Sequence, residues 1–223
     1  MSQSLSAISR VSGAPTRLVD QAYAQLRDHL ITLRIEPGDP LDEKQLSASL
    51  GTGLTPVRDA IKRLTLERLV VTYPRRGTFA AEISVSDELW LTEVREELEG
   101  LAAALAAARA TEAERAALLE MAGAHPSGNH LSMSYMDVDA AIHRGIYAAA
   151  HNPYLESTLN QYANLGMRIW HYALQHVPQS PAGGCDQAAV VTAIVRGDAE
   201  AARDAASAHL RDFSRSVREM LRH

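Results

Sequence analysis

The stretch GTGLTPVRDAIKRL at residues 51–64 decides the fold of the first part of this chain. Its two glycines predict a tight turn. Thr55 and Pro56 then predict the start of a helix, because threonine caps a helix and proline loses no hydrogen bond at the first helical position. That helix would bury Val57, Ile61 and Leu64 and place Arg58, Lys62 and Arg63 on another side.

The segments on either side of this stretch complete a small domain. They predict helices at about 16–35 and 43–50 and short strands at 69–73 and 78–81. The order helix, helix, turn, helix, hairpin is that of a winged helix-turn-helix. We therefore expect a DNA-binding domain at residues 15–82, preceded by a disordered, serine-rich tail at residues 1–14.

Basic residues lie at both places where such a domain would touch DNA. Arg58 lies one turn into the predicted recognition helix, whose N-terminal residues can reach base edges in the major groove. Arg75 and Arg76 lie at the tip of the hairpin, where they can contact phosphate or enter the minor groove. A protein-interaction module is the alternative for this fold, and these arginines would then be solvated surface.

The charge distribution agrees with DNA binding by the front part alone. The chain has 223 residues and a net charge of −5. Residues 1–80 hold 11 basic and 8 acidic side chains, and residues 81–223 hold 11 basic and 19 acidic side chains.

The single cysteine, Cys185, excludes an internal disulfide framework. No long apolar run or signal sequence is present, so we expect a cytoplasmic protein without a membrane span.

The remainder of the chain, residues 83–223, predicts an antiparallel bundle of about six helices, so the fold class is mostly α. Ser86 is expected to cap the first of these helices. Thr111 and Glu114 form a capping-box pattern for the second. The predicted helices span about 86–110, 111–122, 132–150, 153–176, 186–196 and 199–221.

Several motifs in this order resemble the GntR family of bacterial transcription regulators. Residues 16–81 are similar to the family's DNA-binding domain, and residues 87–215 resemble the all-helical FCD effector domain of its FadR-type branch. The motifs that carry the likeness are LDEKQL at 41–46, TPVRDAI at 55–61, PRRGTF at 74–79, VREELEGLA at 94–102, DAAIH at 139–143, NPYL at 152–155 and the segments 193–202 and 209–210.

The resemblance implies a set of DNA-binding residues and shows two departures from the family pattern. The set is Lys44, Thr55, Pro56, Arg58, Lys62, Arg75, Arg76 and Gly77. The family usually has Ser-Arg where this chain has Gly53 and Leu54, and many members have arginine where this chain has Lys44. Lysine cannot make the two-pronged contact of arginine, so we expect a different operator or a lower affinity.

Asp139 and His143 form a candidate metal-binding pair. Their spacing of four residues places both side chains on one side of a helix. Such a pair can share a divalent metal, although it is more often an ordinary hydrogen-bonded pair. The resemblance to metal-binding members of the branch adds His209 as a ligand, and it aligns Gln187 with a fourth ligand that is histidine in those members.

Gln187, in the place of a histidine ligand, leaves three hypotheses open. In the first, zinc, nickel or manganese binds weakly through Asp139, His143 and His209. Alternatively, Asp186, His171 or His176 replaces the missing histidine. In the third hypothesis no metal binds, and Gln187 forms a hydrogen bond with the effector directly.

The effector pocket is expected beside these ligands. Arg95 is the first candidate to bind an effector carboxylate, because a guanidinium binds a carboxylate in a fork, and its alternative role is a salt bridge with Glu99. Arg168 and Gln187 are the further candidates. Tyr135, Trp170 and Tyr172 could line the pocket, although aromatic residues on helices usually belong to the core.

These observations predict a homodimeric transcription regulator, most simply a repressor, whose affinity for operator DNA is controlled by a small organic acid. One alternative is a metal-free regulator that responds to an acyl thioester or another ligand. An alternative of another class is a metal-dependent hydrolase, in which Asp139, His143 and His209 activate a water. No general base is evident near that motif, so we expect no enzymatic activity.

Overall fold

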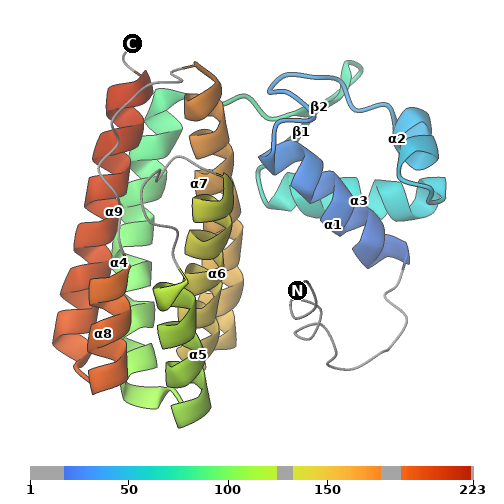
Figure 1. Ribbon diagram of the computed structural model, residues 1–223. Helices are drawn as coiled ribbons and strands as arrows, with labels where there is room; N and C mark the ends of the chain where they lie inside the picture. The colour runs from blue at the N-terminus through green and yellow to red at the C-terminus, as the bar shows by residue number, and fades with distance from the viewer. Residues whose placement is uncertain (1–17, 125–132, 177–186, 222–223) are drawn as a thin grey trace, which may run out of the picture. The chain divides into compact units, whose positions relative to one another are not determined.

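The computed structural model describes residues 18–124, 133–176 and 187–221 (Figure 1). These residues are mostly α-helical, and the chain divides after Glu82 into two compact units. The first unit contains α1 (Leu18–Ile31), α2 (Glu43–Ser49), α3 (Leu54–Leu66), β1 (Val70–Tyr73) and β2 (Gly77–Ala80). The second contains α4 (Val85–Arg109), α5 (Glu112–Gly123), α6 (Met133–Ala149), α7 (Pro153–His176), α8 (Ala188–Arg196) and α9 (Ala199–Leu221).

The first unit is a three-helix core with a β-hairpin. α3 is its centre, because α1, α2 and β1 all pack against it. Leu26, Leu30 and Leu64 are fully buried between the helices. The two strands are antiparallel and pair Val70 with Ala80 at the open end of the hairpin. This arrangement confirms the winged helix-turn-helix that the sequence predicts.

The start of α3 differs from the prediction. Gly53, with an extended backbone, is the residue that caps this helix, and no side chain supplies a cap hydrogen bond. Thr55 is therefore the second residue of α3 and Pro56 the third, instead of the cap and the first residue. Pro56 is still tolerated there, because the first turn of a helix has backbone N–H groups without intrahelical partners.

Arg63 has a structural role in the first unit. Its guanidinium lies 3.5 Å from the centre of the Tyr23 ring, and its Nε donates to Glu67 Oε1 at 3.3 Å. The Tyr23 hydroxyl donates to Glu67 Oε2 at 2.9 Å. Burial, together with this hydrogen bond, raises the pKa of Tyr23. The network ties α1 to the end of α3 and keeps α3 in a fixed position.

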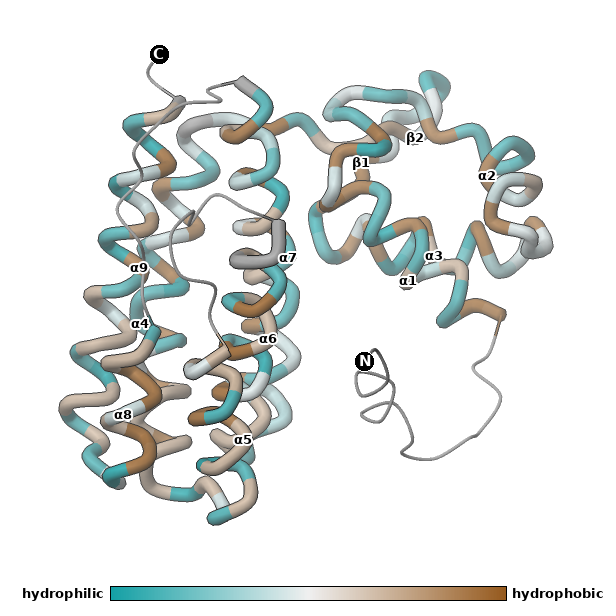
Figure 2. Tube along the Cα trace, in the orientation of Figure 1, coloured by the Kyte–Doolittle hydropathy of each residue, from teal (hydrophilic) through white to brown (hydrophobic). Residues whose placement is uncertain are grey.

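The second unit is a helical bundle built around α4 and α9, which pack along each other. Alanines at the contact, including Ala103, Ala106, Ala202 and Ala206, are buried and let the two helices approach closely. The hydrophobic α8 packs on the same cluster (Figure 2). In the described ranges, none of the helices is long and apolar enough to cross a membrane.

Local capping explains where the helices of this unit begin and end. The capping box of Thr111 and Glu114 starts α5, as predicted. The cap of α4 is Ser84, which forms a capping box with Asp87, and not Ser86. Gly197, with a left-handed φ of +75°, ends α8 and separates it from α9.

Candidate functional site

The exposed side of α3 carries two of the candidate DNA-binding cations. Arg58 and Lys62 lie one turn apart on this helix, with side chains 55% and 75% exposed. Arg58 Nε donates to Glu43 Oε2 on α2 at 2.6 Å. That bond uses Nε, so the two terminal nitrogens of the guanidinium can still form a fork with a base edge.

The hairpin presents the second group. Arg75, Arg76 and Gly77 are exposed at the turn between β1 and β2. Arg75 adopts a φ of +64°, and the Arg76 guanidinium lies 5.7 Å from the centre of the Tyr73 ring. Among the other candidates, Lys44 on α2 and Thr55 on α3 are exposed and Pro56 is half-buried. The candidate cations are therefore accessible to DNA.

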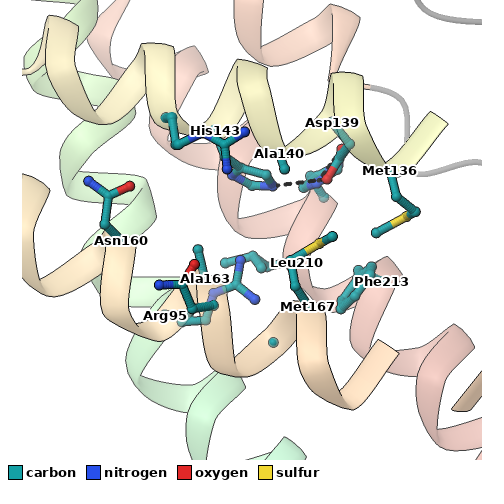
Figure 3. A pocket seen from close by; sticks show the side chains of 14 residues that line it. Arg95, Met136, Asp139, Ala140, His143, Asn160, Ala163, Met167, Leu210 and Phe213 are labelled. Atoms are coloured by element: carbon teal, nitrogen blue, oxygen red, sulfur yellow. Dashed lines mark ion pairs between the residues drawn. The ribbon is translucent and has the colours of Figure 1, made fainter. Parts of the chain in front are cut away.

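The second unit encloses a buried cluster of Asp139, His143 and His209. Asp139 and His143 lie one turn apart on α6 (Figure 3), and His209 on α9 lies close to both. His143 Nε2 lies 3.6 Å from Asp139 Oδ2, and His209 Nε2 lies 3.9 Å from Asp139 Oδ1. One ligand atom from each residue lies within 4.8 Å of the other two. Ligand atoms around a tetrahedral zinc are separated by roughly 3.3 Å, so this donor set fits a small divalent cation.

Gln187 contacts this cluster as a hydrogen-bond donor. Its side chain is 1% exposed, and Nε2 donates to Asp139 Oδ1 at 2.5 Å. Gln187 Oε1 and His209 Nδ1 are buried without a hydrogen-bond partner among the described residues. Both side chains line a small cavity next to His143. A polar cavity with unpaired groups can hold a water or a ligand atom.

Glu99 links the cluster to Arg95. One carboxylate oxygen of Glu99 lies 2.6 Å from Arg95 Nη2, and the other lies 2.9 Å from His143 Nδ1. Burial would raise the pKa of Glu99, but the charges of Arg95 and His143 outweigh it and hold that pKa well below its usual range. Because an ionised carboxylate only accepts, His143 donates from Nδ1 and its Nε2 is directed to Asp139.

The two histidines of the cluster have opposite pKa shifts. Burial lowers the pKa of His143, but the carboxylates of Glu99 and Asp139 outweigh it and raise the pKa above its usual value. Burial lowers the pKa of His209 to about 4. His209 is therefore neutral at pH 7, as a metal-ligating imidazole must be.

A cavity opens beside the cluster. Its lining includes Arg95, Asp139, His143, His209 and the α7 residues Asn160 and Asn164, but it does not include Gln187. The Arg95–Glu99 salt bridge, the alternative role of Arg95, is present, and Arg95 still borders the cavity.

Other candidates from the sequence lie elsewhere. Arg168 is buried but does not line the cavity, and Trp170 and Tyr172 do not line it either. His171 is buried outside the metal cluster, and burial lowers its pKa. Asp186 and the side chains of Tyr135 and His176 lie outside the part of the chain that the structure describes.

Gly166 on α7 leaves space for the Arg95 guanidinium, because it has no side chain. A Cβ at this position would collide with Arg95 Nη1 and lie 3.4 Å from its Cζ. Sequence reasoning missed this glycine, because only the packing of α4 against α7 brings it to Arg95. It also missed Asn160 and Asn164, which follow the NPYL motif on α7 and carry no motif of their own.

Replacing Gly166 with alanine is expected to destabilise the second unit by about 1–3 kcal/mol, because the buried Arg95 must move away from Glu99. The matched control is Gly123→Ala, since a Cβ at Gly123 meets no atom within 4 Å. That change should leave stability unchanged or raise it by up to about 1 kcal/mol. Thermal unfolding of both variants is the measurement, and equal melting temperatures would contradict the role of Gly166.

Comparisons with known proteins identify relatives over most of the chain. Residues 18–80 match the model "Bacterial regulatory proteins, gntR family", and residues 90–212 match the FCD domain model. The HTH-type transcriptional repressor RspR of Escherichia coli strain K12 is 25% identical over 211 residues, 92% of each chain. An uncharacterized HTH-type regulator of Streptomyces ambofaciens is 38% identical over 77 residues, but this match spans only 33% of each chain. The solved structure of E. coli McbR/YncC has a similar fold, with a TM-score of 0.72 at 22% identity over 96% of this chain and 99% of that one.

Proposed function

Because this chain belongs to the GntR family of bacterial regulatory proteins with an FCD domain, we propose that it is a repressor in the cytoplasm that releases operator DNA when a small organic acid binds its helical unit. The family consists of transcriptional regulators and not of enzymes. The observation that carries the proposal is the combination, in one chain, of an exposed basic recognition helix and a cavity lined by both charged and apolar side chains.

The basic residues of the first unit support DNA binding. α3 presents Arg58 and Lys62 to solvent, and a helix of this size fits the major groove. Arg75 and Arg76 at the hairpin would contact the adjacent backbone or minor groove. Phosphate contacts would position the unit, and Arg58 would read a base.

A homodimer is the assembly that this function requires. An inverted-repeat operator has two half-sites, so two copies of the recognition helix must be held together. α4 supports this part of the proposal, because Trp90 and Val94 lie one turn apart and are 62% and 45% exposed. A second copy of this chain would cover such an apolar surface.

The function is tested by sequencing the genomic DNA fragments that the purified full-length protein binds. We expect an inverted repeat with half-sites about one helical turn apart, or 10–10.5 base pairs from centre to centre. Fragments that share no sequence would contradict a sequence-specific regulator. Failure to bind any DNA fragment would instead favour the protein-interaction module.

The cavity beside Asp139 is the proposed effector site. Arg95 has N–H donors that Glu99 does not use, and Arg144 also lines the cavity. A divalent cation held by Asp139, His143 and His209 would supply further positive charge for an acid. Effector binding between α4, α6, α7 and α9 would favour one arrangement of these helices and thereby change DNA affinity.

The metal is tested by titrating purified protein with Zn²⁺ or Mn²⁺. We expect one ion per chain. Loss of a residue that only contacts a metal ligand typically weakens metal binding about 10–100-fold. His209→Ala removes a ligand itself and should therefore weaken binding by more than that. His151→Ala, an exposed histidine outside the cluster, is the control. Gln187→His, which adds an imidazole beside Asp139, should tighten Zn²⁺ binding. No binding by the unmodified protein would favour the metal-free alternative, in which Gln187 forms a hydrogen bond with the effector directly.

A further inference from the structure

Polar side chains, two of them arginines, line one part of the cavity beside Asp139. Figure 3 shows Asn160 and Arg95 on one side of it, away from Met136 and Phe213. Asn164 and Arg144 also line this cavity. Asn160 Nδ2 donates to the Glu156 carbonyl at 2.9 Å, so the amide oxygen of Asn160, an acceptor, is turned toward the cavity (Figure 3). Guanidinium groups suit a carboxylate or another acceptor-rich group.

The opposite end of the cavity is apolar. It is formed by Met136 from α6, Met167 from α7 and Phe213 from α9, with Leu210 between the two ends (Figure 3). Met136 and Leu210 are almost completely buried. Methionine side chains adapt their shape, so this end can accommodate a flexible or aromatic tail.

A hydrophobic cluster supports this apolar wall from behind. The Phe213 ring packs against Trp170 with 5.0 Å between the ring centres. Met167 and Phe213 pack on a buried group that includes Trp170, Val217 and Met220. The wall is therefore backed by side chains that offer no carboxylate or ammonium to a ligand. A second carboxylate placed there would lose its water and lie near Asp139, whose negative charge repels it (Figure 3).

From this separation of polar and apolar lining, and resting on the proposed effector function, we infer that the cavity takes a monocarboxylate with a short alkyl or aryl tail. The carboxylate lies at the end with the Arg95 guanidinium, and the tail lies against Met136, Met167 and Phe213. Dicarboxylates and polyhydroxy acids of the same length are excluded by the apolar end.

The test uses four compounds with six carbons each: hexanoate, hexanamide, adipate and gluconate. Calorimetric titration of the full-length protein, with and without added Zn²⁺, measures each dissociation constant. Hexanoate is expected to bind tightest, and the other three compounds at least about tenfold more weakly. Hexanamide lacks the negative charge that Arg95 would bind. Adipate and gluconate bring polar groups without partners to the apolar end. Butyrate, which is two methylenes shorter than hexanoate, should bind about 15-fold more weakly.

A pair of variants locates the tail. Met167→Gln places an amide at the apolar end and should weaken hexanoate binding about tenfold without weakening gluconate binding. Leu119→Gln changes a 54% exposed leucine on α5 and should leave hexanoate binding unchanged. The ratio of butyrate to hexanoate affinity is measured on the unmodified protein, so it tests the apolar end even if Met167→Gln does not fold.

Two outcomes separate this inference from the proposed function. If adipate or gluconate binds as tightly as hexanoate, the inference is wrong while regulation by an organic acid stands. If none of the acids binds with or without Zn²⁺, the proposed effector function fails together with the inference. A butyrate affinity equal to that of hexanoate also overturns the inference, because it shows that no apolar wall contacts the tail.

Discussion

Replacement of Arg58 with alanine is expected to weaken operator binding at least about 30-fold. An arginine that forks onto a guanine contributes about 1–3 kcal/mol, and a two-fold operator uses it twice. The variant also leaves the Glu43 carboxylate, now 2.6 Å from Arg58 Nε, without that partner beside the DNA backbone. Repulsion from phosphate adds to the loss.

Electrophoretic mobility shift with the selected operator and with unrelated DNA measures this effect. Arg34→Ala is the matched control, because Arg34 is an exposed arginine of the same unit outside α3 and the hairpin. It should lower the affinity for both DNAs slightly and equally. If Arg58→Ala also weakens both DNAs equally, Arg58 contacts only phosphate and does not read a base.

Replacement of Glu99 with glutamine is expected to cost about 3–5 kcal/mol of folding free energy, because it leaves the buried Arg95 guanidinium without its counter-charge. Glu99 is 3% exposed, and its carboxylate holds both Arg95 and His143. Glutamine keeps the size of the side chain, so the loss reports the charge and not a cavity. The melting temperature of the second unit should fall by roughly 6–20 °C.

Differential scanning calorimetry checks this result. Glu97→Gln, at an exposed position of the same helix, removes the same charge and should change stability by less than about 0.5 kcal/mol. A loss below about 1 kcal/mol for Glu99→Gln would mean that Arg95 and His143 find other partners, against the network described above.

Local sequence signals predicted most of the helices and strands. The Thr111 and Glu114 pair predicted the start of α5, because both halves of a capping box lie within four residues. The start of α3 could not be decided in this way. Gly53 and Thr55 are both acceptable caps, and the extended backbone at Gly53 selects the earlier one.

The candidate site was predicted only in part, because much of it depends on packing between helices. The spacing of Arg95 and Glu99 indicated a salt bridge as the alternative role of Arg95, and that salt bridge is present. The contact of Glu99 with His143 joins α4 to α6, and the contact of Gln187 with Asp139 joins residues 48 positions apart. No local pattern encodes such distances. The family resemblance brought Asp139, His143 and His209 together, and their side chains lie together in the structure.

The close approach of Gly166 to Arg95 has an evolutionary consequence. A side chain at position 166 and a guanidinium at position 95 compete for the same space, so a larger residue at 166 is tolerated better when the residue at 95 is shorter. A shorter residue at 95 would in turn leave Glu99 without the Arg95 cation. The three positions are therefore expected to be inherited together.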